Sequence, residues 1–174
     1  TTTGDGQFAP NDAGKIIYFP TDDSEVTFRA YYPYKKDLAS NVMIPVSTKD
    51  QSSLPEIDLM TAEHLSGTST ADPNVKLHFY HRLAKVVVNL TTDEKNDQIL
   101  DDVQLVIKGL KTEASYDLLN EALIVDNNRS DENVAIPVRS AIGEGIILPR
   151  LPGEGVEFEV TTADGGKYTA ALSS

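Results

Sequence analysis

Hydrophobic and polar residues alternate along much of the chain with the period of two that is typical of β-strands. The segment 75–90 is apolar at odd-numbered positions in its first half and at even-numbered positions in its second half. One uninterrupted strand with this pattern would turn its apolar side chains from the core to the solvent. It would also extend over about 53 Å, which is much longer than the usual strand. We therefore predict two strands, or one strand bent by a bulge, with the change near His81 and Arg82. Such a transfer of apolar residues between layers is typical of a β-sandwich.

Other alternating segments predict strands and their turns. Residues 16–19 form an apolar run, and residues 26–32 alternate after a short polar turn, so we expect these two segments to pair as a hairpin. Residues 103–107 alternate as a further strand. Residues 156–160 and 168–172 alternate on either side of an Ala-Asp-Gly-Gly turn, which predicts a second hairpin.

Two segments leave their secondary structure open. Residues 57–65 fit a short helix or a strand, and residues 116–125 fit a helix or a hairpin that turns at Asn120. The remaining pattern contains at least eight short strands, no long helix and no alternation of strands with helices. We therefore predict an all-β protein of the sandwich class.

Composition and charge exclude several classes of function. The 27 acidic and 15 basic residues give a formal net charge of −12, and no cluster of Lys and Arg is present, so we expect neither a nucleic-acid partner nor attraction to an anionic membrane surface. The chain has no cysteine, which excludes disulfides, zinc–thiolate sites and thiol catalysis. It opens on Thr1 rather than Met, so we expect an excerpt of a longer precursor.

The sequence contains no convincing catalytic or metal-binding motif. His78 and His81 are three residues apart, so an extended strand would point them to opposite faces, and we predict no metal site. We expect His81 at the bend of the central segment, where its ring could bond backbone groups that a bulge leaves unpaired. There is no nucleophile elbow and no phosphate-binding glycine loop. We therefore predict that the protein is not an enzyme and needs no cofactor.

The one aromatic cluster consists of Tyr31, Tyr32 and Tyr34 around Pro33. Aromatic rings at a rim can stack on sugars, so these three tyrosines are the candidate ligand-binding residues for a surface glycan. In the alternative interpretation, alternate tyrosines line the core and the others cap an edge, with their hydroxyl groups in water.

A series of motifs in this order and spacing resembles the fimbrillin-like (Mfa-like) proteins, which are pilin and tip-adhesin subunits of type V fimbriae. The motifs are GQFAP at 6–10, KIIYFP at 15–20, VTFRAYYPY at 26–34, IDLMTA at 57–62, LHFYHRLAKV at 77–86 and VQLVIKGL at 103–110. No piece is diagnostic by itself, but the series spans nearly the whole chain.

The resemblance implies two transthyretin-like β-sandwich domains, mainly antiparallel, at residues 1–92 and 93–174. The first would lack its first strands and the second its last strand. It further implies a non-enzymatic fimbrial subunit or tip adhesin that assembles with other fimbrial subunits by β-strand donation. Such a subunit would mediate cell adhesion to a host or bacterial surface protein or glycan. The expected location is extracellular, in a fimbrium at the outer-membrane surface, reached through a lipid anchor on the precursor. The alternative function is that of a surface glycan-binding β-sandwich module.

Overall fold

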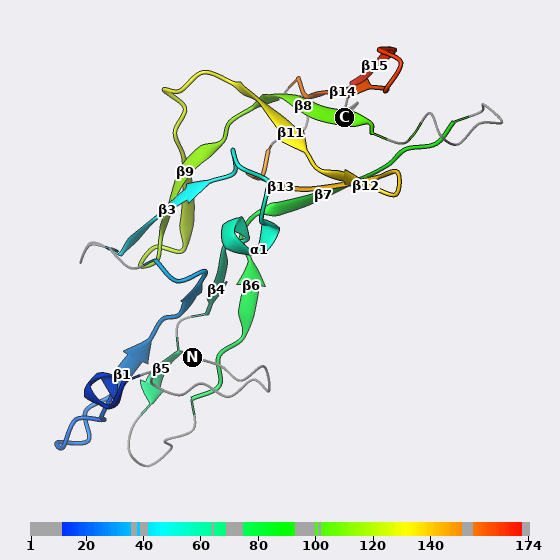
Figure 1. Cartoon of the computed structure of the whole chain (residues 1–174). Helices are drawn as coiled ribbons and strands as arrows, with labels where there is room; N and C mark the ends of the chain where they lie inside the picture. Colours follow the sequence, from blue (N-terminus) through cyan, green and yellow to red (C-terminus); the bar gives the residue numbers. More distant parts are fainter. Residues whose placement is uncertain are drawn as a thin grey trace. The chain divides into compact units, whose positions relative to one another are not determined.

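The computed structural model describes residues 12–35, 38, 42–63, 65–68, 75–92, 100, 102–150 and 155–171. The described chain is mostly β-structure with one short α-helix, and its strand pairs are antiparallel (Figure 1). It forms two compact units, of which one comprises residues 1–30 and 63–78 and the other comprises residues 31–62 and 79–174. Each unit is described by itself below.

The helical elements are the 3₁₀ turn η1 (Ala13–Lys15) and α1 (Leu54–Ile57). The strands are β1 (Val26–Phe28), β2 (Tyr31–Tyr32), β3 (Met43–Ser47), β4 (Met60–Ala62), β5 (Leu65–Thr68), β6 (Phe79–His81), β7 (Ala84–Asn89), β8 (Gln104–Leu110), β9 (Glu113–Asp117), β10 (Ala122–Val125), β11 (Glu132–Ile136), β12 (Val138–Arg139), β13 (Ile142–Ile147), β14 (Glu157–Thr161) and β15 (Lys167–Ala171).

The smaller unit is a two-stranded sheet in which β1 pairs with β5. The predicted hairpin between 16–19 and 26–32 is therefore wrong. Residues 16–19 form no strand, and Ile17 and Tyr18 are each 77% exposed. The second segment is divided, because β1 ends at Phe28 and β2 belongs to the larger unit. A polar turn between two apolar runs permits a hairpin, but the choice of partner depended on residues 65–68, far away in the sequence.

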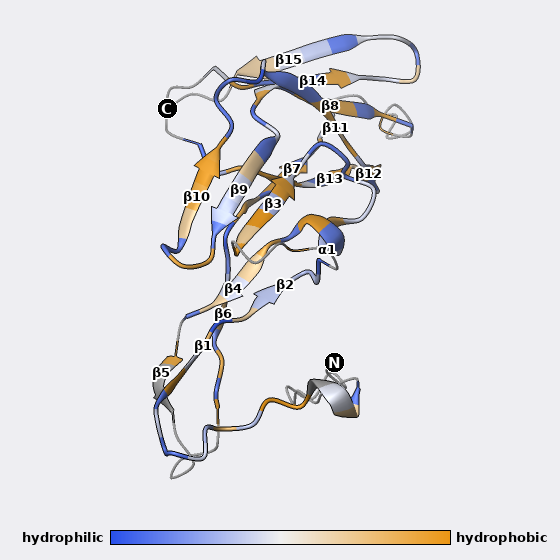
Figure 2. Cartoon of the chain, turned by 90° about the vertical axis from the view of Figure 1, so that its left-hand side faces the viewer, coloured by the Kyte–Doolittle hydropathy of each residue, from blue (hydrophilic) through white to orange (hydrophobic). Residues whose placement is uncertain are grey.

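The described part of the larger unit contains four sheets, with the strand orders β11-β8-β14-β15, β12-β13-β7, β10-β9-β3 and β2-β4-β6. Figures 1 and 2 show the four-stranded sheet stacked over β12-β13-β7, so that these two sheets form a sandwich. The segment 116–125 is the β9–β10 hairpin, in which Tyr116 pairs with Leu123. The C-terminal hairpin is confirmed as β14 and β15, which lie in register from Glu157 to Thr161.

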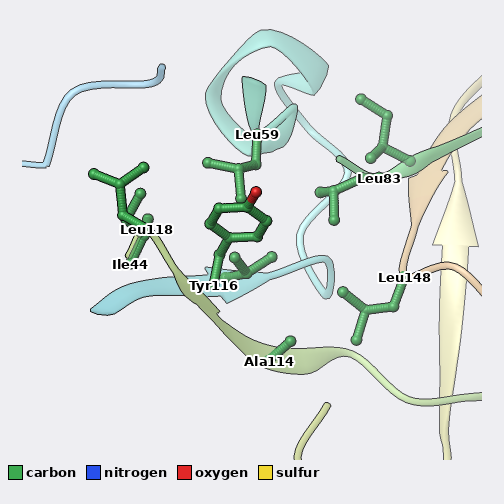
Figure 3. Close-up of a cluster of buried hydrophobic side chains, with 9 residues drawn as sticks. Ile44, Leu59, Leu83, Ala114, Tyr116, Leu118 and Leu148 are labelled. Atoms are coloured by element: carbon green, nitrogen blue, oxygen red, sulfur yellow. The ribbon is translucent and has the colours of Figure 1, made fainter. Parts of the chain in front are cut away.

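The larger unit has two clusters of buried side chains. The first surrounds Tyr116, whose ring lies among Ile44, Leu59, Leu83 and other apolar side chains (Figure 3). The second fills the sandwich, and its buried members are Leu105, Ile107, Leu110, Val134, Ile136 and Val156. Close approach of the two sheets requires glycine on β13, since a Cβ added at Gly143 would lie 2.5 Å from Leu105 Cδ2.

The central segment consists of two strands, as predicted. β6 ends at His81 and pairs with β4, while β7 begins at Ala84 and pairs with β13. Between them, Arg82 donates from Nε to Thr61 Oγ1 at 2.6 Å, and its guanidinium lies over the Tyr116 ring at 5.6 Å. These contacts hold the chain where it changes from one sheet to another.

The division into domains at residues 92 and 93 stays a prediction. Residues 93–99 lie outside the described residues. Within the larger unit, strands from both sides of this position share sheets, because β7 pairs with β13 and β3 pairs with β9. Any two-domain description has to accommodate these pairings.

Candidate functional site

The sandwich of the larger unit has one side on which its two sheets do not match. Within the described ranges, one sheet has four strands and ends with β15, whereas the opposite sheet has three and ends with β7. Among the described strands, β7 pairs with β13 alone. One strand beside β7 would complete the second layer over β15.

The free edge of β7 presents backbone hydrogen-bonding groups. Leu90 N donates to Ala141 O at 2.8 Å, so these two residues form a hydrogen-bonded pair. Hydrogen-bonded and non-hydrogen-bonded pairs alternate along an antiparallel ladder. The N–H and C=O groups of Lys85, Val87 and Asn89 therefore point away from β13. This is the arrangement to which a further strand can bind.

The inner face of the four-stranded sheet becomes progressively more exposed toward the same side. Ile107 of β8 is completely buried, and its neighbour Phe158 of β14 is partly buried. On β15, Ala170 lies opposite Phe158 and is exposed, and Tyr168 on the same face is 59% exposed. Apolar side chains thus continue on this face beyond the part that the second sheet covers.

An open cleft of about 380 Å³ lies at this position. It is lined by 87–90 at the end of β7, by Phe158 and Val160 of β14, and by 168–170 of β15. We call it the β7–β15 cleft. Its apolar floor and the outward backbone groups of β7 suit an extended peptide segment, with the backbone held by β7 and alternate side chains held by the floor.

Two other strand edges in the larger unit are closed or blocked. At the edge of β13 away from β7, the buried amide of Gln51 accepts from Ile146 N at 2.8 Å and donates to Ile146 O at 2.8 Å. On β3, the bonded pair of Thr48 N and Thr112 O places Pro45 at an outward position. Proline offers no N–H there, so an added strand would lack one donor.

Charged side chains lie on the outer face of the four-stranded sheet. Lys108 Nζ of β8 donates to Glu159 Oε2 at 2.7 Å and to Glu157 Oε1 at 3.1 Å, both on β14. The hydrogen bond from Lys108 lowers the pKa of Glu159, and the same bonds raise the pKa of Lys108. Polar groups thus mark the solvent side of the sheet and apolar groups the cleft side.

The structure separates the three candidate tyrosines. Tyr31 packs against the cluster around Tyr116, and its hydroxyl donates to Lys35 O at 3.5 Å. Tyr32 is 40% exposed and Tyr34 is 75% exposed. This agrees with the interpretation in which alternate tyrosines line the core, while glycan binding by these residues stays a prediction.

His81 lies at the end of β6, where the chain leaves this strand, and its Nδ1 faces a carboxylate side chain. Its Nδ1 lies 2.9 Å from Asp58 Oδ2 and 3.0 Å from Asp58 Oδ1. His64 lies outside the described residues. Within the described ranges, no group of three or more His, Cys, Asp or Glu side chains is placed to hold a metal ion. No helix in the same ranges is long and apolar enough to cross a membrane.

Comparison with known proteins places the chain in a family. The fimbrillin-like family model matches residues 1–174. The chain belongs to the fimbrillin-like family. This fimbrillin-like chain is 29% identical over 162 residues to "Putative fimbrium subunit Fim1C" of Bacteroides uniformis, a match that covers 92% of the chain and 53% of the relative.

Solved structures give the same relationship. The fimbrillin-like chain superposes on the crystal structure of a "putative cell adhesion protein" from Bacteroides uniformis with a TM-score of 0.85 and 28% identity, over 91% of the chain and 64% of that protein. The crystal structure of a "putative cell adhesion protein" from Bacteroides thetaiotaomicron superposes with a TM-score of 0.57 and 22% identity, over 88% of the chain and 60% of that protein. This match shows similarity of fold alone. The chain thus spans about half of the curated relative and less than two thirds of these solved chains.

The residues of the β7–β15 cleft were not singled out by the sequence. The alternation of 156–160 and 168–172 identified the strands and the face that they share. It did not show that the partner sheet ends one strand short. The available signal was the composition of β15, in which Tyr168 and Ala170 give its inner face only modest apolar area.

Proposed function

We propose that this chain is a large part of a non-enzymatic fimbrial subunit that assembles by β-strand donation and mediates cell adhesion. On this proposal, a neighbouring fimbrial subunit supplies a strand that pairs with β7 and covers the floor of the β7–β15 cleft. The names of the relatives, a fimbrium subunit and a cell adhesion protein, support the fimbrial and adhesive part.

The observation that carries the assembly proposal is the unmatched side of the sandwich. An added strand would bond with the outward groups of Lys85, Val87 and Asn89 and bury Phe158 and Tyr168. Burial of apolar surface contributes roughly 25 cal/mol per Å², and backbone pairing fixes the register. A cleft on one side of each subunit joined to a strand from the next is a head-to-tail contact, which generates a filament when it does not close into a ring.

The proposal includes the export route and the domain arrangement. The precursor is a lipoprotein that reaches the cell outer membrane, and the mature subunit is extracellular in the fimbrium. The subunit consists of two transthyretin-like β-sandwich domains that divide near residue 92, with β3 and β7 from before this position completing sheets of strands from after it.

A proline at the free edge tests this function. Val87→Pro removes one outward N–H of β7. Pro45 occupies the same kind of outward position on β3, so a strand of this protein accommodates proline there. We expect the full-length Val87→Pro protein to fold, and to lose head-to-tail polymerisation after removal of its N-terminal segment. Val87→Thr keeps the N–H and serves as the matched control.

Size-exclusion chromatography with light scattering and electron microscopy measure the outcome. Polymers of Val87→Thr together with monomers of Val87→Pro support strand donation at β7. Polymerisation of Val87→Pro at the wild-type rate would contradict it.

A second proposal is glycan binding through the exposed tyrosines. Its support is the exposure of Tyr32 and Tyr34 on either side of Pro33. Rings of this kind can stack on sugar faces. A glycan array on the wild type and on Tyr34→Ala tests it. If the wild-type protein binds no glycan on the array, the proposal is overturned.

A further inference from the structure

The β7–β15 cleft has an uneven floor, which sets a requirement on the donor strand. Tyr168 and Ala170 lie on the inner face of β15, two residues apart, opposite Val160 and Phe158 of β14. Both line the cleft together with the end of β7. The floor is therefore raised at the tyrosine ring and recessed at the alanine methyl group.

A strand that pairs with β7 presents alternate side chains to this floor. Its inward residues are about 6.6 Å apart, since a strand rises roughly 3.3 Å per residue and successive side chains alternate. Tyr168 and Ala170 have the same spacing. Stacked sheets keep their strand directions within about 30° of each other, so two successive inward residues of the donor can meet these two positions.

We propose that Ala170 selects the donor: its recess takes a large apolar side chain of the incoming strand, and Tyr168 restricts the adjacent inward position to a small residue. This inference rests on the proposed function, and it names the partner as a fimbrial subunit strand with a large apolar residue and a small residue at adjacent inward positions. The outer face of the same strand is polar, because it completes the solvent side of the β7 sheet.

Ala170 and Ala171 provide a matched pair of variants. Ala170→Leu fills the recess. Ala171→Leu adds the same side chain to the outer face, where Ala171 lies opposite Glu157. Both positions are exposed, so neither change disturbs the buried core.

Two heptapeptides, each labelled with fluorescein at its N-terminus, serve as probes for the full chain. Each carries threonine at its outward positions. One has leucine and alanine alternating at its inward positions, so that either strand direction offers the same pair, and the other has each leucine replaced by alanine. Fluorescence anisotropy measures their dissociation constants, and circular dichroism checks the fold of each variant.

We expect the leucine peptide to bind the wild type and Ala171→Leu equally, and to bind Ala170→Leu at least about tenfold more weakly. On Ala170→Leu, the alanine peptide should no longer bind more weakly than the leucine peptide. Equal binding of the leucine peptide to both variants would overturn selection by Ala170 and leave strand donation standing. If neither peptide binds the wild type and the outward amides of Lys85, Val87 and Asn89 resist hydrogen exchange, a segment of the same chain fills the cleft, and both proposals fail.

Discussion

Truncations across the four-stranded sheet test how its inner face is covered. Ile107→Ala on β8 removes three carbon atoms from a completely buried position. At about 0.8 kcal/mol per carbon plus the cost of the cavity, we expect the free energy of unfolding to fall by about 3–4 kcal/mol. Phe158→Ala on β14 affects a partly buried ring, for which about 2 kcal/mol is expected. Tyr168→Ala on β15 should cost about 0.5 kcal/mol or less, because most of its ring is already in water.

Urea unfolding of the monomeric chain, followed by circular dichroism, gives these free energies by linear extrapolation. The decisive result is the order of the three losses. A loss of about 2 kcal/mol or more for Tyr168→Ala would show that β15 is covered in the monomer. In that case the β7–β15 cleft would not be open to a donor strand, and the reasoning would be refuted.

Three further predictions concern residues that stabilise the two sheets on either side of the cleft. Gln51→Ala leaves a backbone N–H and C=O of β13 without their buried partner, and should lower the free energy of unfolding by about 2–4 kcal/mol in urea denaturation. Gly143→Ala places a methyl group against a leucine of β8 and should cost about 1–3 kcal/mol, whereas Gly155→Ala, with open space around it, should be neutral in the same thermal or urea assay. For Glu159, the hydrogen bond from Lys108 lowers the pKa below the ordinary 4.5, so its stabilising contribution is present above that value and is lost as the pH falls through the lowered pKa of the folded state. Glu159→Gln should therefore be less stable than the wild type at pH 7 and should converge with it in acid, and a constant difference across a pH series would contradict this assignment.

The sequence predicted the strands far better than their partners. The parity change in 75–90 located the break between β6 and β7, because the side-chain period of a strand depends only on neighbouring residues. The C-terminal hairpin was also predictable, since its two strands are joined by a short turn. Both predictions used local information.

The pairing of strands that lie far apart in the sequence could not be predicted from the alternation of apolar and polar residues. Residues 16–19 have the apolar run of a strand, yet β1 pairs with β5 instead. Likewise, nothing in the alternation of 84–89 indicated that β7 would be the last of the described strands in its sheet. The cleft follows from this pairing, whereas on the other edge of β13 the strand β12 pairs with its first residues and the amide of Gln51 bonds with Ile146. The three tyrosines showed the same limit, because only the packing of Tyr31 separated it from its exposed neighbours.

Hydrogen exchange at β7 tests the central claim most directly. In the isolated chain, the amide of Val87 points away from β13, while that of Val88 points toward it. We predict that Val87 exchanges rapidly in the monomer and becomes protected in the assembled polymer, whereas Val88 is protected in both. Protection of Val87 in the monomer, or its rapid exchange in the polymer, would contradict assembly by strand addition to β7.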